Sequence, residues 1–327
     1  MRSRAIRAAL ACAGAVAVAG LAAGCTSGGA PASGESASTG SGTDFVIDQD
    51  FADPGVIVDG DTAYAFATNT PGFAVRAATS HDMRQWTVSD KDALTALPAW
   101  ASPGKTWAPD VVKVDDGYVM YLTAKESSSA YQCIGTATSS TAGGPYTGVG
   151  AEPLVCPHDA GGAIDASTFR DDDGALYLVW KTDGNCCGLD TWIELAPLSA
   201  DGLSLTGPAV RLLDQGRAWE GDLIEAPYLV KRSGEYVLFY SANDYATDRY
   251  AIGVATASAL AGPYQPSDSP FLSTESSKGR YLGPGGQSVV TLDGKDWLVF
   301  HSWDEAYSYR GMVVRPLAWA GATPSLG

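Results

Sequence analysis

Three acidic residues open three copies of one repeated pattern in this sequence. Asp53, Asp165 and Glu225 each stand before a β-branched run, an Asp/Gly-type turn and an aromatic run. Carboxylates that are brought together repel one another, so stability alone gives no reason to gather them. Such clusters separate the pKa values of their members, and one site can then hold an acid and a base. These residues therefore indicate general acid–base chemistry.

The pattern occurs five times, which is typical of a repeat architecture. Its copies begin at Asp53, Trp107, Asp165, Glu225 and Gly286. Eleven positions after each start stands a large residue, and these residues are Tyr64, Tyr118, Leu176, Tyr236 and Trp297. This constant spacing predicts the register of the five copies.

Each copy predicts a β-hairpin, with turns such as Asp116-Gly117 and Asp293-Gly294. A weaker second signature follows, for example at 78–87, and indicates outer strands. Four strands per unit and five units predict an all-β fold, a five-bladed β-propeller over residues 44–327, which protects its sheet edges by radial repetition. A two-sheet sandwich is the alternative, but it does not explain five copies in one register.

The order of the blades predicts how the acidic residues meet. The innermost strand of each blade lines the central channel, so the five starting residues should form a ring at one mouth. Blades 3 and 4 are neighbours, which places Asp165 beside Glu225, and Asp53 should lie across the axis. A wide gap between acid and base leaves room for water; in glycoside hydrolysis, carboxylates roughly 6.5–9.5 Å apart give inversion.

The segments around these residues resemble glycoside hydrolase family 43. The segments are Asp53-Pro54, Trp107-Ala108-Pro109-Asp110-Val111, Ile164-Asp165, Glu225-Ala226-Pro227 and Gly283-Pro284-Gly285. The resemblance implies a five-bladed propeller and inverting chemistry on arabinans, arabinofuranosides and xylosides. It also implies Asp53 as the general base, Glu225 as the general acid, and Asp165 as a pKa modulator that orients the acid.

Three further residues are candidates for substrate binding. Arg310 resembles the arginine that some xylosidase members point at the sugar, and a cation there would also keep Asp53 ionised. Many arabinan-cleaving members carry His-Asn where this chain has Gly286-Gln287, and their His lies near a central ion. Because this chain lacks that His, we expect no metal and no cofactor, and Gln287 is expected to fill the space of the ion site with an amide. Trp107 is either plain core or a platform on which a sugar stacks. His301 follows an aromatic strand and is expected to be core.

Composition and cysteine content indicate which partners and which cysteine chemistry to expect. The chain has 327 residues with 21 Lys+Arg against 37 Asp+Glu, a net charge of −16, so we expect no nucleic-acid partner. Export makes disulfides the favoured state of the four cysteines in the folded part. Among the three possible pairings we favour Cys133–Cys156 and Cys186–Cys187. A metal or redox site is the alternative, disfavoured because no CxxC is present and His numbers 3.

The N-terminus is predicted to be a targeting signal. Three arginines within the first seven residues precede the apolar run Ala8–Ala23, which predicts a signal peptide over residues 1–24. Its end resembles a bacterial lipobox, with Cys25 as the lipidation site; free secretion after cleavage nearby is the alternative. Residues 25–43 are rich in Ser and Gly and are expected to be a flexible linker. The protein is thus expected to be extracellular and tethered to a membrane only through a lipid anchor.

These expectations combine into one hypothesis with three rivals. The chain is expected to be a monomeric, inverting glycosidase that cleaves α-L-arabinofuranosyl linkages in arabinan- or arabinoxylan-type polysaccharides. A β-xylosidase of the same family, a non-catalytic carbohydrate-binding propeller and an enzyme that transfers sugars are the alternatives. In each case the expected partner is an oligo- or polysaccharide.

Overall fold

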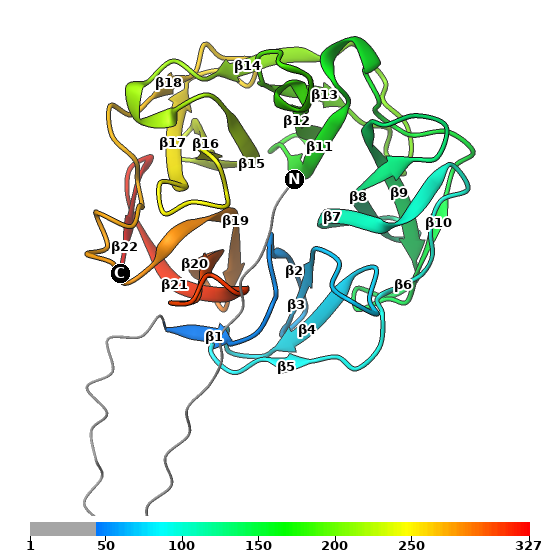
Figure 1. Ribbon diagram of the computed structural model, residues 1–327, viewed down its shortest axis with the longest axis horizontal. Helices are drawn as coiled ribbons and strands as arrows, with labels where there is room; N and C mark the ends of the chain where they lie inside the picture. Colours follow the sequence, from blue (N-terminus) through cyan, green and yellow to red (C-terminus); the bar gives the residue numbers. More distant parts are fainter. Residues whose placement is uncertain (1–43) are drawn as a thin grey trace, which may run out of the picture. The chain divides into compact units, whose positions relative to one another are not determined.

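Five sheets surround a central axis in the computed structural model, which describes residues 44–327 (Figure 1). Each sheet is built around one of the five expected hairpins, so the prediction of an all-β, five-bladed propeller is confirmed. The expected signal peptide, Cys25 and the linker lie outside the described residues. Within the described range, no helix has the length and apolar character needed to cross a membrane.

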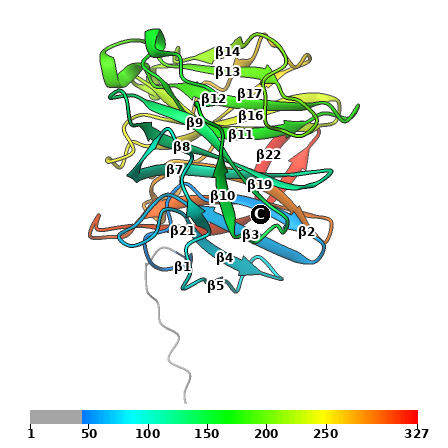
Figure 2. The same ribbon diagram turned by 90° about the vertical axis from the view of Figure 1, so that its right-hand side faces the viewer.

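Three of the blades have the four strands that the repeats predict. Blade 1 contains β2 (Gly55–Asp59), β3 (Thr62–Ala67), β4 (Arg76–Ser80) and β5 (Thr87–Val88). Blade 3 contains β11 (Ala163–Arg170), β12 (Leu176–Thr182), β13 (Trp192–Pro197) and β14 (Val210–Asp214). Blade 4 contains β15 (Ile224–Arg232), β16 (Glu235–Ala242), β17 (Ala251–Ala257) and β18 (Gln265–Pro266). Figure 2 shows these sheets from the side, with strands of blade 3 at the top and of blade 1 at the bottom.

The other two blades have five strands. Blade 2 contains β7 (Ala101–Val114), β8 (Gly117–Glu126), β9 (Gln132–Ser139), β10 (Tyr146–Val149) and β6 (Leu94–Ala96). Blade 5 contains β19 (Leu282–Leu292), β20 (Lys295–Trp303), β21 (Arg310–Ala320), β22 (Thr323–Leu326) and β1 (Phe45–Ile47). Short 3₁₀ turns complete the described part at η1 (His158–Ala160), η2 (Gly184–Cys187) and η3 (Ala218–Glu220).

The first described strand closes the ring. β1 pairs antiparallel with β21, with Phe45 opposite Val313, so chain segments from the two ends share blade 5. In Figure 1 this strand lies in blue beside the red strands of the last blade. The repeat pattern does not contain β1, and no motif of the chain predicts this closure.

Every inner strand carries a kink at the same structural position. Five residues there have left-handed backbone angles: Asp53 (φ 52), Ala108 (φ 43), Asp165 (φ 57), Ala226 (φ 48) and Gly286 (φ 57). In blades 2 to 5 the ladder of hydrogen bonds shifts across this position, as in a β-bulge. A bulge re-aims the side chains on either side of it. In blade 1 the left-handed residue, Asp53, stands two residues before β2 instead.

The expected register is wrong by one residue in blades 2 and 4, and also on the second strand of blade 3, where Tyr177 takes the position expected for Leu176. The residues equivalent to Asp53 are Ala108 and Ala226, rather than Trp107 and Glu225. The equivalent large residues on the second strands are Tyr64, Val119, Tyr177, Val237 and Trp297. These second strands are buried on both faces, so their sequences lack the alternation that would fix the register.

The hydrophobic core is divided among the junctions between blades. Five clusters of buried side chains lie between blades 1 and 2, 2 and 3, 3 and 4, 4 and 5, and 5 and 1. Between blades 3 and 4, for example, Phe169 and Val179 pack against Leu229 and Leu238. Each inner strand is therefore held from both sides, which fixes the residues that face the axis.

Two disulfides lie in blades 2 and 3. Cys133 of β9 is bonded to Cys156, and Cys186 is bonded to its neighbour Cys187 in η2. These are the two pairs that the sequence favoured.

Candidate active site

The five left-handed positions surround a narrow central cavity of about 40 Å³. Its lining comes from the inner strand of every blade and includes Asp53, Asp110, Asp165, Tyr228 and Gln287. Two of the three expected carboxylates, Asp53 and Asp165, are thus brought to one place from blades 1 and 3. Glu225 precedes Ala226, which also lines the cavity.

Asp53 is held as an anion by two neighbours, Thr68 and Arg310. Thr68 Oγ1 donates to Asp53 Oδ2 at 2.6 Å, and Arg310 Nη1 lies 3.4 Å from Oδ1. The backbone N–H of Asp53 donates to His301 Nδ1 at 3.1 Å. Burial by itself would raise the pKa of Asp53, but the charge of Arg310 and the hydrogen bond from Thr68 outweigh it and hold this pKa well below its ordinary value. The carboxylate is therefore ionised at neutral pH.

His301 fills space that a glycine leaves open. A Cβ on Gly286 would lie 2.6 Å from His301 Nδ1 and 2.7 Å from Asp53 Oδ1. The imidazole is fully buried, and burial followed by the charge of Arg310 lowers its pKa. A neutral ring is required for Nδ1 to accept the bond from Asp53. The expectation that His301 is core is right about its burial, but the residue also touches the candidate base.

Glu225 is bound at both carboxylate oxygens. Lys181 Nζ donates to Oε2 at 3.0 Å, and the hydroxyl of Tyr250 donates to Oε1 at 2.7 Å. Lys181 comes from β12 of blade 3, whereas Tyr250 stands directly before β17. The side chain of Glu225 is 13% exposed, so it remains open to a substrate.

Asp165 lies beside Glu225, as the blade order predicts. Its Oδ2 accepts from the backbone N–H of Ala226 at 3.0 Å, and its own N–H donates to Thr123 Oγ1. Burial and then the nearby charge of Glu225 raise the pKa of Asp165 well above its ordinary value, although Lys181 acts in the opposite direction. The pKa values of Asp53 and Asp165 are thus shifted in opposite directions within one site.

Two stacked rings connect the Asp53 side of the site with the Glu225 side. The rings of Tyr250 and His301 are nearly parallel, 4° apart, with centroids 5.8 Å apart. A Cβ on Gly285 would lie 2.0 Å from Tyr250 Cε1, so this glycine is what admits the phenol ring. The consecutive glycines at 285 and 286 therefore make room for one ring each.

Arg310 and Trp107 lie where substrate contact is possible. Arg310 opens β21, and its guanidinium lies over the rings of Tyr245 and Trp303, with its carbon 4.8 and 5.8 Å from their centroids. Tyr245 is 49% exposed, so these aromatic side chains face solvent beside Asp53. Trp107 is half-buried and occupies in blade 2 the register position that Glu225 occupies in blade 4.

Gln287 bridges blades 4 and 5. Its Oε1 accepts from Ser241 Oγ at 2.9 Å, and its Nε2 donates to the backbone oxygen of Ala226 at 2.7 Å. The residue is 4% exposed, so its amide fills the space, as expected, and holds the backbone after Glu225. The role in substrate binding expected for it stays a prediction.

The residues at the axis do not reproduce a histidine-containing ion site. Position 286 has no side chain, and the imidazole in that space, from His301, uses Nδ1 for the backbone of Asp53.

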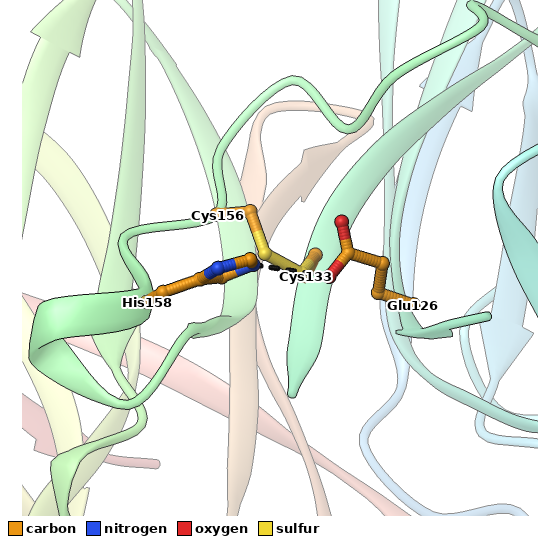
Figure 3. Close-up of side chains that lie close together, drawn as sticks. All are labelled: Glu126, Cys133, Cys156 and His158. Carbon is orange, nitrogen blue, oxygen red and sulfur yellow. Dashed lines mark hydrogen bonds and ion pairs between the residues drawn. A yellow bond between two sulfur atoms is a disulfide. The ribbon is translucent and has the colours of Figure 1, made fainter. Parts of the chain in front are cut away.

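A second group of possible ligand atoms lies in blade 2 and the segment that follows it. Glu126, Cys133, Cys156 and His158 place one such atom each within 4.8 Å of one another. Figure 3 shows the imidazole of His158 directed at Glu126, and its Nε2 is 3.0 Å from Oε2. Because the two cysteines are bonded to each other, only Glu126 and His158 keep free ligand atoms.

Three site residues were not predicted from the sequence: Lys181, Tyr250 and Thr68. Lys181 had a readable signal, since it is a lone charge in the otherwise apolar strand LYLVWKT, and a buried lysine requires partners. The sequence around Tyr250 and Thr68 contains no such signal, because their roles arise from contacts with distant strands.

The fold and the carboxylates together define a class, the propeller enzymes that act on glycosidic bonds. A family model described as glycosyl hydrolases family 43 matches residues 43–322, and the chain belongs to this family.

Known proteins agree with this assignment. The chain is 28% identical over 239 residues to the "Beta-D-galactofuranosidase xynD" of Aspergillus niger, covering 69% of this chain and 64% of that protein. It is 29% identical over 308 residues to the "Extracellular exo-alpha-(1->5)-L-arabinofuranosidase ArbA" of Cellvibrio japonicus, covering 83% and 84%. Among solved structures, a thermostable family-43 glycoside hydrolase matches with a TM-score of 0.74 at 26% identity, covering 85% of this chain and 93% of that one.

Proposed function

We propose that this chain is an inverting glycoside hydrolase that cleaves α-L-arabinofuranosyl linkages in arabinan- or arabinoxylan-type polysaccharides. The observation that carries the proposal is the meeting of Asp53, kept ionised by Arg310 and Thr68, with the neighbouring carboxyls of Asp165 and Glu225. Family membership supports the reaction class.

Each carboxyl has a distinct role in this proposal. Asp53, as general base, takes a proton from water while the water oxygen attacks the anomeric carbon. Glu225, as general acid, gives its proton to the departing oxygen. Asp165 contacts the backbone that follows Glu225 and keeps the acid oriented. Arg310 binds the sugar next to Asp53, and Trp107 is a platform on which a neighbouring sugar stacks.

The names of the relatives favour a furanose substrate. They include an exo-arabinofuranosidase of Cellvibrio japonicus and an endo-arabinanase of Bacillus subtilis, beside the galactofuranosidase of Aspergillus niger. α-L-Arabinofuranose and β-D-galactofuranose have the same configuration around the ring and differ in the exocyclic group. A pocket for this ring would accept either sugar, whereas a β-xylosidase requires a pyranose.

A panel of aryl glycosides tests the substrate. We expect hydrolysis of aryl α-L-arabinofuranoside, weaker hydrolysis of aryl β-D-galactofuranoside, and little of aryl β-D-xylopyranoside. Proton NMR should detect β-L-arabinofuranose as the first product if the reaction inverts. Preferred cleavage of the xyloside would establish the β-xylosidase instead, and transfer products at high sugar concentration would indicate a transferase.

Single substitutions test the carboxyls. Asp53→Asn and Glu225→Gln should each lower kcat/KM on linear arabinan about 10²–10⁴-fold, with unchanged circular dichroism. Asp173→Asn, in the exposed turn between β11 and β12, is the matched control and should keep full activity. A wild-type protein that cleaves no glycoside but is retained on an arabinan column would support the non-catalytic binding propeller.

We also propose export and lipid attachment at Cys25. Several relatives are named extracellular. The test is incorporation of labelled palmitate in a bacterial host, which should be lost in Cys25→Ala. Incorporation that persists in this variant, or a wild-type protein found unlabelled in the medium, would favour free secretion.

A further inference from the structure

A buried lysine contacts the candidate general acid. The side chain of Lys181 is 1% exposed although its strand is apolar on both sides. An ammonium group removed from water is costly unless it is paired. Its Nζ donates to Glu225 Oε2 at 3.0 Å and lies 3.5 Å from Asp183 Oδ1. The carboxylates of Glu225 and Asp183 therefore keep Lys181 charged.

The two donors to Glu225 suit its anionic form. Tyr250 O–H points at one carboxylate oxygen and Lys181 at the other. The remaining titratable groups near Glu225 are Asp165 of β11, Asp183 after β12 and His301 of β20. Of the cations in the described residues, Lys181 is the one in an ion pair with Glu225.

The hydrolysis creates negative charge at this carboxyl. As the bond between the anomeric carbon and the glycosidic oxygen breaks, the electron pair stays on that oxygen and takes the proton of Glu225. Water adds to the anomeric carbon and loses a proton to Asp53. One carboxyl is thus protonated while the other becomes an anion, and a cation beside the new anion stabilises it as it forms.

We propose that Lys181 is a positioning residue for the proton donor, fixing Glu225 and stabilising the carboxylate that remains after proton transfer. The proposal rests on the proposed function, because it takes Glu225 as the acid. Asp183, whose Oδ1 lies 3.5 Å from Lys181 Nζ, is a second anionic partner of the ammonium group.

The test compares Lys181→Met with the wild type on two leaving groups. Without the cation, Glu225 holds its proton more tightly, so the basic limb of the kcat/KM profile moves to higher pH. Arabinobiose needs protonation of its leaving oxygen and should lose at least about tenfold in rate. The dinitrophenolate of dinitrophenyl arabinofuranoside departs without needing a proton, so the rate on this substrate should fall less than about threefold. Equal losses on both substrates with an unmoved basic limb would refute the proposal.

A second variant and a matched control separate this role from a structural one. Lys181→Gln keeps a donor of similar size without the charge, and it should show the same pH shift if Lys181→Met does not fold. Lys231→Met removes another lysine that pairs with an aspartate, Asp171, outside the site. This variant should leave unchanged the basic limb of the kcat/KM profile and the ratio of rates on the two substrates.

A titration independent of activity distinguishes this proposal from the proposed function. In protein labelled with ¹³C at glutamate carboxyls, the Glu225 signal, assigned with Glu225→Gln, should titrate at higher pH in Lys181→Gln than in the wild type. If the wild type cleaves no glycoside but this shift is observed, the pairing stands and the proposed function fails. An unshifted Glu225 signal rejects the role of Lys181 itself.

Discussion

The carboxyls at the axis differ because their neighbours differ. Asp53 faces a guanidinium and a hydroxyl, so its pKa lies low, whereas Asp165 is buried beside another acid and its pKa lies high. Both residues have a left-handed backbone at equivalent positions. The opposite shifts of their pKa values therefore come from contacts across blades rather than from local conformation.

Asp110 is a buried acid that the proposed chemistry does not use. The N–H and the hydroxyl of Thr168 both donate to its Oδ2, at 2.9 and 2.8 Å. Burial, partly offset by these bonds, raises the pKa of Asp110 to about 7 from its ordinary 3.8. Between these two pH values the unfolded chain releases the proton and the folded chain keeps it. Stability contributed by this group therefore falls as pH rises from about 4 to about 7.

Asp110→Asn removes this titration but keeps an oxygen that can accept from Thr168. We expect the variant to match the wild type near pH 4 and to be more stable near pH 8, by up to about 4 kcal/mol at 1.36 kcal/mol per pKa unit. Urea denaturation at both pH values measures the difference. A difference of equal size at pH 4 and pH 8 would contradict the assigned direction.

Among the structural elements, the bulged start of β19 tolerates the fewest residue types. It must turn through a left-handed angle at Gly286 and leave room for the rings of Tyr250 and His301. Gly294, in the turn between β19 and β20, has a similar angle (φ 71) but no atom within 4 Å of its missing Cβ. The two glycines thus share the conformational demand and differ only in crowding.

Gly286→Ala should displace His301 or Asp53, because its Cβ would lie under 3 Å from both. We expect at least about a tenfold fall in kcat/KM, since small misplacements of catalytic groups are costly. Gly294→Ala should cost about 1 kcal/mol of stability and leave kcat/KM unchanged. Assays on aryl arabinofuranoside with parallel thermal denaturation measure both. Equal kinetics in the two variants would show that the close contact at Gly286 does not position Asp53.

The hairpins were predictable because Asp/Gly turns and apolar runs are local signals. The exact register was not, since strands such as β8 and β16 are buried on both faces and a shift of one residue leaves the pattern apolar. Asp53 and Asp165 could be found because they open repeats. Glu225 was found although it precedes the bulge, because the bulge turns neighbouring positions toward the same site.

At the scale of the whole molecule, the site depends on a closed ring. Its side chains come from all five blades, with Thr123 of blade 2 accepting from the N–H of Asp165, and five separate core clusters hold the blades in place. The sequence shows five repeats but not how the first meets the last. That contact is made by three residues without a repeat signal, paired to a strand more than two hundred residues away.

The closing strand also leads the chain to the site. After β1 the chain runs beside β21, and the N–H of Phe51 donates to the backbone oxygen of Arg310 at 2.9 Å. Two residues later it reaches Asp53, which the Arg310 side chain contacts. Ring closure and the pairing of Asp53 with Arg310 are thus made by neighbouring residues of the same two segments.

A chain that begins at residue 48 should therefore be less stable than one that begins at residue 44. It loses the β1–β21 ladder, the buried Ile47, and the packing of the Phe45 ring over Gly311. Removal of two large apolar side chains costs roughly 3–5 kcal/mol, which corresponds to a fall in Tm of roughly 6–20 °C. Below its Tm the shorter chain should keep most of its kcat/KM, because the Phe51–Arg310 bond remains. An unchanged Tm would mean that the ring is closed by the blade junctions alone, without the strand.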